Sequence, residues 1–111
     1  MTLDDLEAYG ANTQEGLQRC MGVKSLYLRL VESIKTEDRF DRLAQAIDEG
    51  RLSDAFDAAH ALKGVLGNLS LTPLQRPMEE ITELLRNQTP ADYKTLVEQI
   101  LAERDRFRAL S

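Results

Sequence analysis

Residues 59–70 read AHALKGVLGNLS, and this stretch contains His60, the only histidine of the chain. Lys63, Gly64 and Gly67 follow within two helical turns. A glycine in the interior of a helix is less favourable than alanine by about 0.8–1.0 kcal/mol. Two glycines so close to one imidazole therefore indicate a requirement other than helix stability.

Helical geometry places His60 opposite the apolar face of a helix predicted over residues 53–69. With a rotation of about 100° per residue and His60 at 0°, the predicted core side chains lie between about 160° and 240°: Ala55, Ala58, Leu62, Leu66 and Leu69. Lys63, Gly64 and Gly67 lie within about 60° of His60, on the side that faces water. The pattern predicts an exposed imidazole beside a cation and a shallow depression.

Upstream of this helix, apolar residues recur at helical spacing. The stripes run over residues 26–34 and 40–47, and the polar residues 35–38 lie between them, so residues 24–48 form either one helix or two. Thr36 could cap a second start. Gly50 favours a helix end, and Ser53 can cap the helix that carries His60.

Downstream, two prolines mark helix starts. Thr72, Pro73 and Gln75 have the spacing of an N-cap, a first helical position and a capping box. Thr89 and Pro90 repeat the pattern before a final apolar stripe over residues 93–107. Met21, Met78 and the aromatic residues have the spacing of core positions.

These helices predict an all-α fold. Four amphipathic helices with short connections favour an antiparallel four-helix bundle over residues 24–109. Residues 1–22 contain two short helical patterns, 3–9 and 13–20, with Gly10 and Gly22 as breaks, and we expect them to pack against the bundle. A chain of 111 residues suits a single domain, 1–111.

Composition argues against several classes of protein. A net charge of −5 without a basic stripe argues against a nucleic-acid partner. One cysteine and one histidine are too few for a structural zinc site. The chain has no apolar run of membrane-spanning length, and its acidic N-terminus lacks the features of a secretory signal. We therefore expect a cytoplasmic protein without metal or membrane contact.

A solvated imidazole with no neighbouring nucleophile suits group transfer better than hydrolysis. No nucleophile elbow and no second histidine accompany His60. An imidazole with an ordinary pKa of about 6.5 is mostly neutral at pH 7 and is itself a nucleophile. Transient phosphorylation fits these features, because Lys63 would offset the phosphoryl charge while Gly64 and Gly67 would let a partner approach.

The run His60-Ala61-Leu62-Lys63-Gly64, followed by Gly67-Asn68-Leu69, resembles the signature of histidine-phosphotransfer (HPt) domains of two-component phosphorelays. Residues 6–22 resemble the lead-in of small free-standing members. Ser70 departs from the pattern, since many members have a further glycine there.

The resemblance implies a four-helix bundle that is not itself an enzyme. His60 would be the phosphoacceptor, taking a phosphoryl group on Nε2 from a receiver-domain aspartate and passing it to another receiver. Lys63, Gly64 and Gly67 would contact the phosphate or the receiver. The implied partners are response-regulator receivers and hybrid histidine kinases. Mg²⁺ would belong to the receiver, so we expect no cofactor here, and we expect a monomer.

Members of this family often orient the imidazole with a polar side chain from the neighbouring helix. Thr82 is the first candidate by register, and Glu79 is one turn away. Two other functions remain open. A helical adaptor would use the same scaffold without phosphorylation, and a small enzyme would need a second catalytic group such as Glu79 or Asp57 in a concave pocket.

Overall fold

A computed structural model describes residues 1–110; residue 111, the last of the predicted single domain, lies outside the described residues. The elements are, in chain order, α1 (Leu3–Tyr9), α2 (Thr13–Arg19), α3 (Lys24–Ser33), the 3₁₀ helix η1 (Ile34–Thr36), α4 (Arg39–Asp48), α5 (Leu52–Asn68), α6 (Thr72–Arg86) and α7 (Tyr93–Arg108). Residues 1–110 form helices and turns without strands, which confirms the all-α class. None of these helices is long and apolar enough to cross a membrane.

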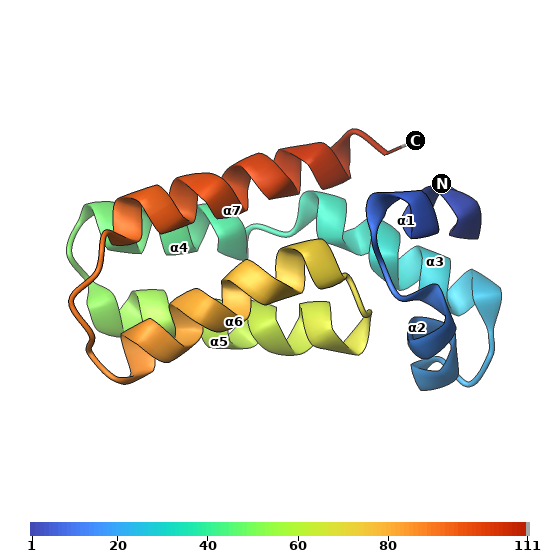
Figure 1. The fold of residues 1–111 in the computed structure, drawn as a ribbon, viewed down its shortest axis with the longest axis horizontal. Coiled ribbons are helices and arrows are strands. Elements are labelled where there is room, and N and C mark those ends of the chain that lie inside the picture. Colours follow the sequence, from blue (N-terminus) through green and yellow to red (C-terminus); the bar gives the residue numbers. More distant parts are fainter. Residues whose placement is uncertain (111) are drawn as a thin grey trace.

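Four helices surround one core. Helix α5 packs against α4 and α6, and α7 packs against α6 and α4. Figure 1 shows α4 beside α7 and α5 beside α6, with the chain running back and forth along the long axis. The molecule measures 40 × 24 × 19 Å. Because each of these four helices touches two others of the group, each buries one apolar stripe and leaves the rest of its surface in water.

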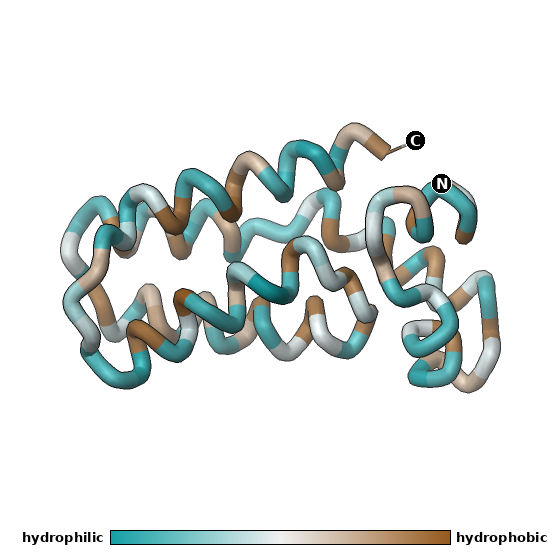
Figure 2. Tube along the Cα trace, viewed as in Figure 1, coloured by the Kyte–Doolittle hydropathy of each residue, from teal (hydrophilic) through white to brown (hydrophobic). Residues whose placement is uncertain are grey.

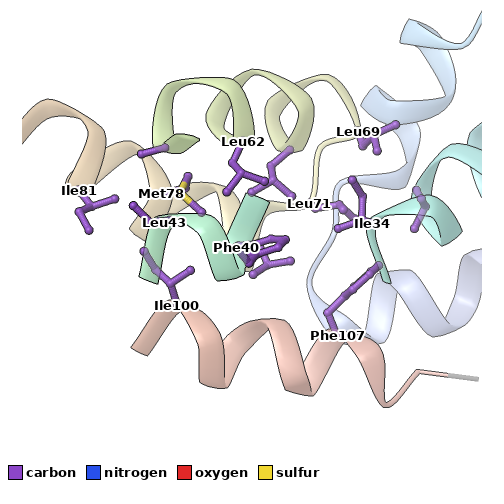
Figure 3. Packing of buried hydrophobic residues seen from close by; sticks show 14 of the residues in the cluster. Ile34, Phe40, Leu43, Leu62, Leu69, Leu71, Met78, Ile81, Ile100 and Phe107 are labelled. Atoms are coloured by element: carbon purple, nitrogen blue, oxygen red, sulfur yellow. The ribbon is translucent and has the colours of Figure 1, made fainter. Parts of the chain in front are cut away.

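The core lies along the centre of this group. Hydrophobic positions recur along the tube of each helix in Figure 2, and Figure 3 shows side chains from all four helices converging. Phe40, Leu62, Met78, Ile100 and Phe107 are completely buried. Burial of each such side chain contributes about 1.5–3 kcal/mol relative to its exposure to water.

Helices α1, α2 and α3 close the end of the bundle where α5 turns into α6 (Figure 1). The Asn12 backbone amide donates to the Ser70 carbonyl at 3.0 Å, and the Tyr27 hydroxyl donates to the Leu69 carbonyl at 2.9 Å. Burial raises the pKa of Tyr27 to about 12. Gly16 permits the close approach of α2 to α3, since a Cβ there would lie 2.4 Å from the Tyr27 ring. The predicted N-terminal helices are thus anchored to the turn after the His60 helix.

Helix α1 also contacts the end of α7. The rings of Tyr9 and Phe107 meet edge to face with centroids 5.5 Å apart, and the Arg106 guanidinium lies 4.7 Å from the centre of the Tyr9 ring. The Arg106 side chain donates to the Tyr9 carbonyl at 3.4 Å. The first and last helices therefore lie together at one end of the molecule.

The structure settles the open question over residues 24–48, which form two helices separated by η1. Thr36 does not cap the second helix; its hydroxyl donates to the Ser33 carbonyl. The Glu37 carboxylate instead accepts from the Arg39 amide at 2.9 Å and from the Arg39 guanidinium at 2.7 Å, which lowers the pKa of Glu37 to about 2. The four-helix group begins at Arg39 rather than at residue 24, because the extended backbone at Glu37 ends the preceding helical segment.

The predicted capping roles of Ser53, Thr72 and Gln75 are wrong. Ser53 lies inside α5, and Thr72 is the first residue of α6; neither helix has a side-chain N-cap hydrogen bond. The Gln75 side chain donates to Glu79 at 2.8 Å. In the first turn of α6 the Leu74 and Gln75 amides both donate to the Leu71 carbonyl, at 3.0 and 2.9 Å.

The final helix begins later than predicted. Asp92, not Thr89, is its N-cap, and the Asp92 carboxylate accepts from the Thr95 amide at 3.1 Å. An aspartate three residues before that amide satisfies one of the unpaired donors of the first turn. Residues 87–92 therefore form a longer connection than the predicted proline start implied.

The core prediction is right for most positions and wrong for a few. Ala55, Leu62, Leu66 and Leu69 are buried as expected, but Ala58 is half-buried and Ala59 is completely buried. Met78 is buried, whereas Met21 is 90% exposed and Phe56 is half-buried. Leu30 is also exposed, at 39%.

Candidate functional site

His60 lies in the middle of α5 with its side chain exposed to solvent. Leu62 and Leu66, on the opposite face of the same helix, are completely buried. The predicted orientation is therefore confirmed. The imidazole projects away from the core, on a helix that is held on its other faces by α4 and α6.

An aromatic ring supports the imidazole. Phe56, one turn earlier in α5, stacks on His60 with ring centroids 5.5 Å apart and an angle of 10° between the planes. The Arg86 guanidinium, at the end of α6, lies 5.1 Å from the centre of the Phe56 ring. Stacked rings at this spacing attract each other, and a guanidinium over an aromatic face adds a cation–π contact. Phe56 thus restricts the plane of the imidazole.

Lys63, one turn after His60, is linked to α6 through Glu83. The Lys63 ammonium lies 3.9 Å from Glu83 Oε1, and the Arg86 Nε donates to the same oxygen at 3.2 Å. The Lys63 and Glu83 side chains are 31% and 53% exposed, so water screens their attraction. The site therefore contains two cations that share one carboxylate oxygen.

Gly64 has no packing reason to be glycine. A Cβ built on Gly64 would meet nothing within 4 Å, and the residue is exposed. A Cβ on Gly67 would make an ordinary contact, 3.5 Å from the Gln75 side chain. The absence of a side chain at residue 64 leaves open space beside the imidazole without any benefit to the fold within residues 1–110.

Thr82 and Glu79, the predicted orienting residues, have other partners in the structure. The Thr82 side chain is completely buried, and its hydroxyl donates to the Met78 carbonyl at 2.6 Å. The Glu79 carboxylate is exposed and accepts from Gln75. Their predicted action on His60 stays a prediction.

Sequence reasoning missed Phe56, Glu83 and Arg86. The spacing of Phe56 and His60, i and i+4 on one helix, is a signal that could have revealed their contact. The core spacing of the aromatic residues instead predicts a buried Phe56, whereas Phe56 is half-buried. Glu83 and Arg86 reach the site from α6, so finding them requires the register between two helices.

Two hollows flank this part of α5. One, of about 590 Å³, is lined by Leu52, Phe56, Leu85, Tyr93 and neighbouring polar residues. The other, of about 330 Å³, lies towards α4 and includes Asp57 in its lining. His60 lines neither hollow. Residues 1–110 also contain no group of three or more His, Cys, Asp or Glu side chains arranged to hold a metal.

Comparison with known families agrees with this geometry. The family model described as Hpt domain matches residues 34–110, which is more than half of the chain. The chain belongs to the Hpt domain family. Membership implies involvement in phosphorelay histidine phosphotransfer, in which Hpt domains act as carriers rather than catalytic enzymes and interact with receiver domains and kinases. No curated protein and no solved structure matches the chain.

The matched segment contains η1 and the four helices α4 to α7, while α1, α2 and α3 precede it. Ser70 of this Hpt domain has a φ of +55°. That left-handed conformation favours glycine, the residue that the resemblance leads us to expect at this position. The Ser70 hydroxyl donates to Glu15 Oε1 at 3.2 Å, so the serine adds a bond to α2 that glycine lacks.

Proposed function

We propose that this Hpt domain is a phosphorelay intermediate and that His60 is its phosphoacceptor. One observation carries the proposal: the only histidine of the chain is exposed in the middle of a packed helix. A family that transfers phosphoryl groups through histidine has no other imidazole available here. The stacked Phe56 ring and the open space at Gly64 support the same assignment.

The transfer reaction needs little from this chain beyond a positioned nucleophile. The Nε2 lone pair attacks the phosphorus of a receiver aspartyl phosphate, the N–P bond forms, and the P–O bond to the aspartate breaks. The aspartate leaves as a carboxylate, and the proton on Nδ1 stays with the ring. Transfer to a second receiver reverses these steps. The chemistry that Mg²⁺ supplies belongs to the receiver domain.

The neighbouring residues have separate roles in this proposal. Lys63 offers a positive charge one turn from His60 and would offset the phosphoryl charge. Gly64 leaves room for the receiver backbone, because no atom of the described chain fills the position of its Cβ. Gly67 extends the same clearance by one turn.

The surface around His60 suits a protein partner. Leu52, two turns before His60, is 47% exposed, and it borders the hollow that contains Phe56 and Tyr93. Exposed apolar side chains beside a reactive group favour docking of another protein over binding of a small substrate. We propose receiver domains and hybrid histidine kinases as these partners. We also propose a monomeric protein of the cytoplasm, whose monomeric state a solution mass measurement would test.

The decisive experiment is phosphoryl transfer from a receiver domain charged with acetyl phosphate. The wild-type chain should acquire a label that is labile in acid and stable in alkali, as expected for an N–P bond. The His60→Gln variant should remain folded by circular dichroism and acquire no label. Label that persists on His60→Gln would overturn the assignment.

The same experiment separates phosphotransfer from a purely adaptor function. An adaptor would bind the receiver, and size-exclusion chromatography would detect the complex, but no label would appear on the wild-type chain. A panel of receivers must be used, because specificity between partners is a difference in affinities.

A further inference from the structure

The contact between Lys63 and Glu83 suggests a role for Glu83 that neither the family nor the proposed function assigns. Glu83 lies on α6, is 53% exposed, and directs Oε1 towards both Lys63 and Arg86. Lys63 is the cation nearest in sequence to His60, at the i+3 position of the same helix. The positive charge beside the imidazole is therefore already partly neutralised before any phosphoryl group arrives.

We propose that Glu83 is a positioning residue that competes with the phosphoryl group on His60 for Lys63. This inference rests on the proposed role of His60 as phosphoacceptor. In the unphosphorylated protein, Glu83 holds Lys63. In the phosphorylated protein, Lys63 turns to the phosphoryl oxygens, and Glu83 keeps Arg86 as its partner.

The geometry makes this exchange easy. The Lys63–Glu83 distance of 3.9 Å exceeds normal hydrogen-bond length, while the Arg86–Glu83 distance is 3.2 Å. A phosphoryl group carries a charge of about −1.5 to −2 and three strong acceptor oxygens, so it attracts an ammonium more strongly than one screened carboxylate does. Lysine is suited to this change, since its ammonium is a compact charge on a flexible stem.

The competition affects the balance between phosphorylated and free protein. Glu83 lowers the free energy of the unphosphorylated state through Lys63, and its negative charge repels a phosphoryl group nearby. Both effects favour passing the phosphoryl group on. Glu83 would therefore keep the phosphohistidine from becoming a stable end point, which is a useful property in a carrier.

The test uses a receiver domain that phosphorylates the wild-type protein. It measures how the phosphoryl label is distributed at equilibrium between that receiver and this chain. Glu83→Gln should shift the equilibrium towards phosphorylated His60 by about two- to fivefold, the equivalent of one weak ion pair. The matched control is Glu98→Gln on α7, which removes the same charge from an exposed position and should leave the equilibrium unchanged. The shift should also shrink at 1 M salt, where the screening length falls to about 3 Å.

A double variant shows whether Glu83 acts through Lys63. In a Lys63→Met background only the direct repulsion remains, so Glu83→Gln should shift the equilibrium clearly less than it does in the wild-type background. An undiminished effect in that background, an unchanged equilibrium in Glu83→Gln alone, or an equal shift in Glu98→Gln would overturn the proposal. These failures differ from failure of the proposed function, in which the wild-type chain itself acquires no label on His60.

Discussion

The rings of Phe56 and His60 lie parallel on adjacent turns of α5, with centroids 5.5 Å apart and planes inclined by 10°. The Phe56 ring lies against one face of the imidazole, while His60 as a residue remains exposed to solvent. A ring held in one plane presents its nitrogens in a restricted set of directions, which lowers the entropy lost when a receiver docks.

Loss of the Phe56 ring should slow transfer without unfolding the protein. Phe56→Leu removes a stack worth about 0.5–1.5 kcal/mol, so we expect the transfer rate to fall by about two- to tenfold. Phe56→Tyr keeps the ring and should retain the wild-type rate. Rapid-quench measurement of label transfer from a charged receiver checks both variants.

Thr82→Val provides the comparison. The Thr82 hydroxyl is bonded to the Met78 carbonyl in the buried face of α6, so its removal should leave the transfer rate close to wild type. A rate loss in Thr82→Val as large as that in Phe56→Leu would instead identify Thr82 as the orienting residue.

Gly64 should separate stability from function. Gly64→Ala should raise the free energy of unfolding by about 0.8–1.0 kcal/mol, because the added Cβ meets no atom within 4 Å and alanine favours the helix. Urea unfolding followed by circular dichroism measures this gain. Gly64→Leu should also remain folded, yet it should slow transfer by obstructing the receiver. Wild-type transfer by Gly64→Leu would contradict the clearance argument.

Ionisation of Glu37 should make the free energy of unfolding depend on pH. Its pKa falls from 4.5 to about 2 because the Arg39 guanidinium and amide bind the carboxylate in the folded state. A carboxyl group whose folded pKa is depressed contributes stability above its unfolded pKa, and that contribution disappears as pH falls towards the folded value. We expect Glu37→Gln to be less stable than wild type by about 1–2 kcal/mol near neutral pH.

The difference between wild type and Glu37→Gln should shrink as the pH falls from 4.5 to 2. Urea titrations across this interval measure it, with Glu98→Gln as the variant of equal charge. A difference that stays constant over the interval would show that the two bonds to Arg39 do not depend on ionised Glu37.

Ser70 offers a test of backbone conformation. Its φ of +55° costs a residue with a side chain about 1–2 kcal/mol relative to glycine. Ser70→Gly relieves this cost but loses the hydroxyl bond to Glu15, so it should lie close to wild type in stability. Ser70→Ala loses the bond and keeps the cost, so it should be the less stable of the two by about 1 kcal/mol or more. Thermal unfolding of the pair checks the difference.

The sequence alone predicts those features of the fold that depend on a single helix or a single residue. The direction of His60 follows from the rotation per residue in a helix, and the ends of helices at Gly10 and Gly50 follow from the positive φ that glycine tolerates. The break between α3 and α4 is less visible in the sequence, because neither proline nor glycine marks it. The extended backbone at Glu37 ends the first segment, and the Glu37 side chain accepts from the Arg39 amide at the start of α4.

The predictions that are wrong or missing concern features that depend on contacts between helices. Thr72 and Thr89 have the sequence pattern of caps, but the turns before α6 and α7 are fixed by backbone bonds and by Asp92. The bridge from Glu83 to Lys63 depends on how α5 and α6 are aligned, which no single-helix pattern encodes. Side chains that join two helices are therefore the part of the site that requires a structure.

The edge-to-face contact of Tyr9 with Phe107 brings both ends of the chain to the same end of the molecule. A circularly permuted protein is therefore feasible. A short flexible linker would join the end of α7 to the start of α1, and new ends would open in the exposed connection at residues 90–92, remote in sequence from His60. Such a permutant would place α7 ahead of α1 in the polypeptide without altering the neighbours of the histidine helix.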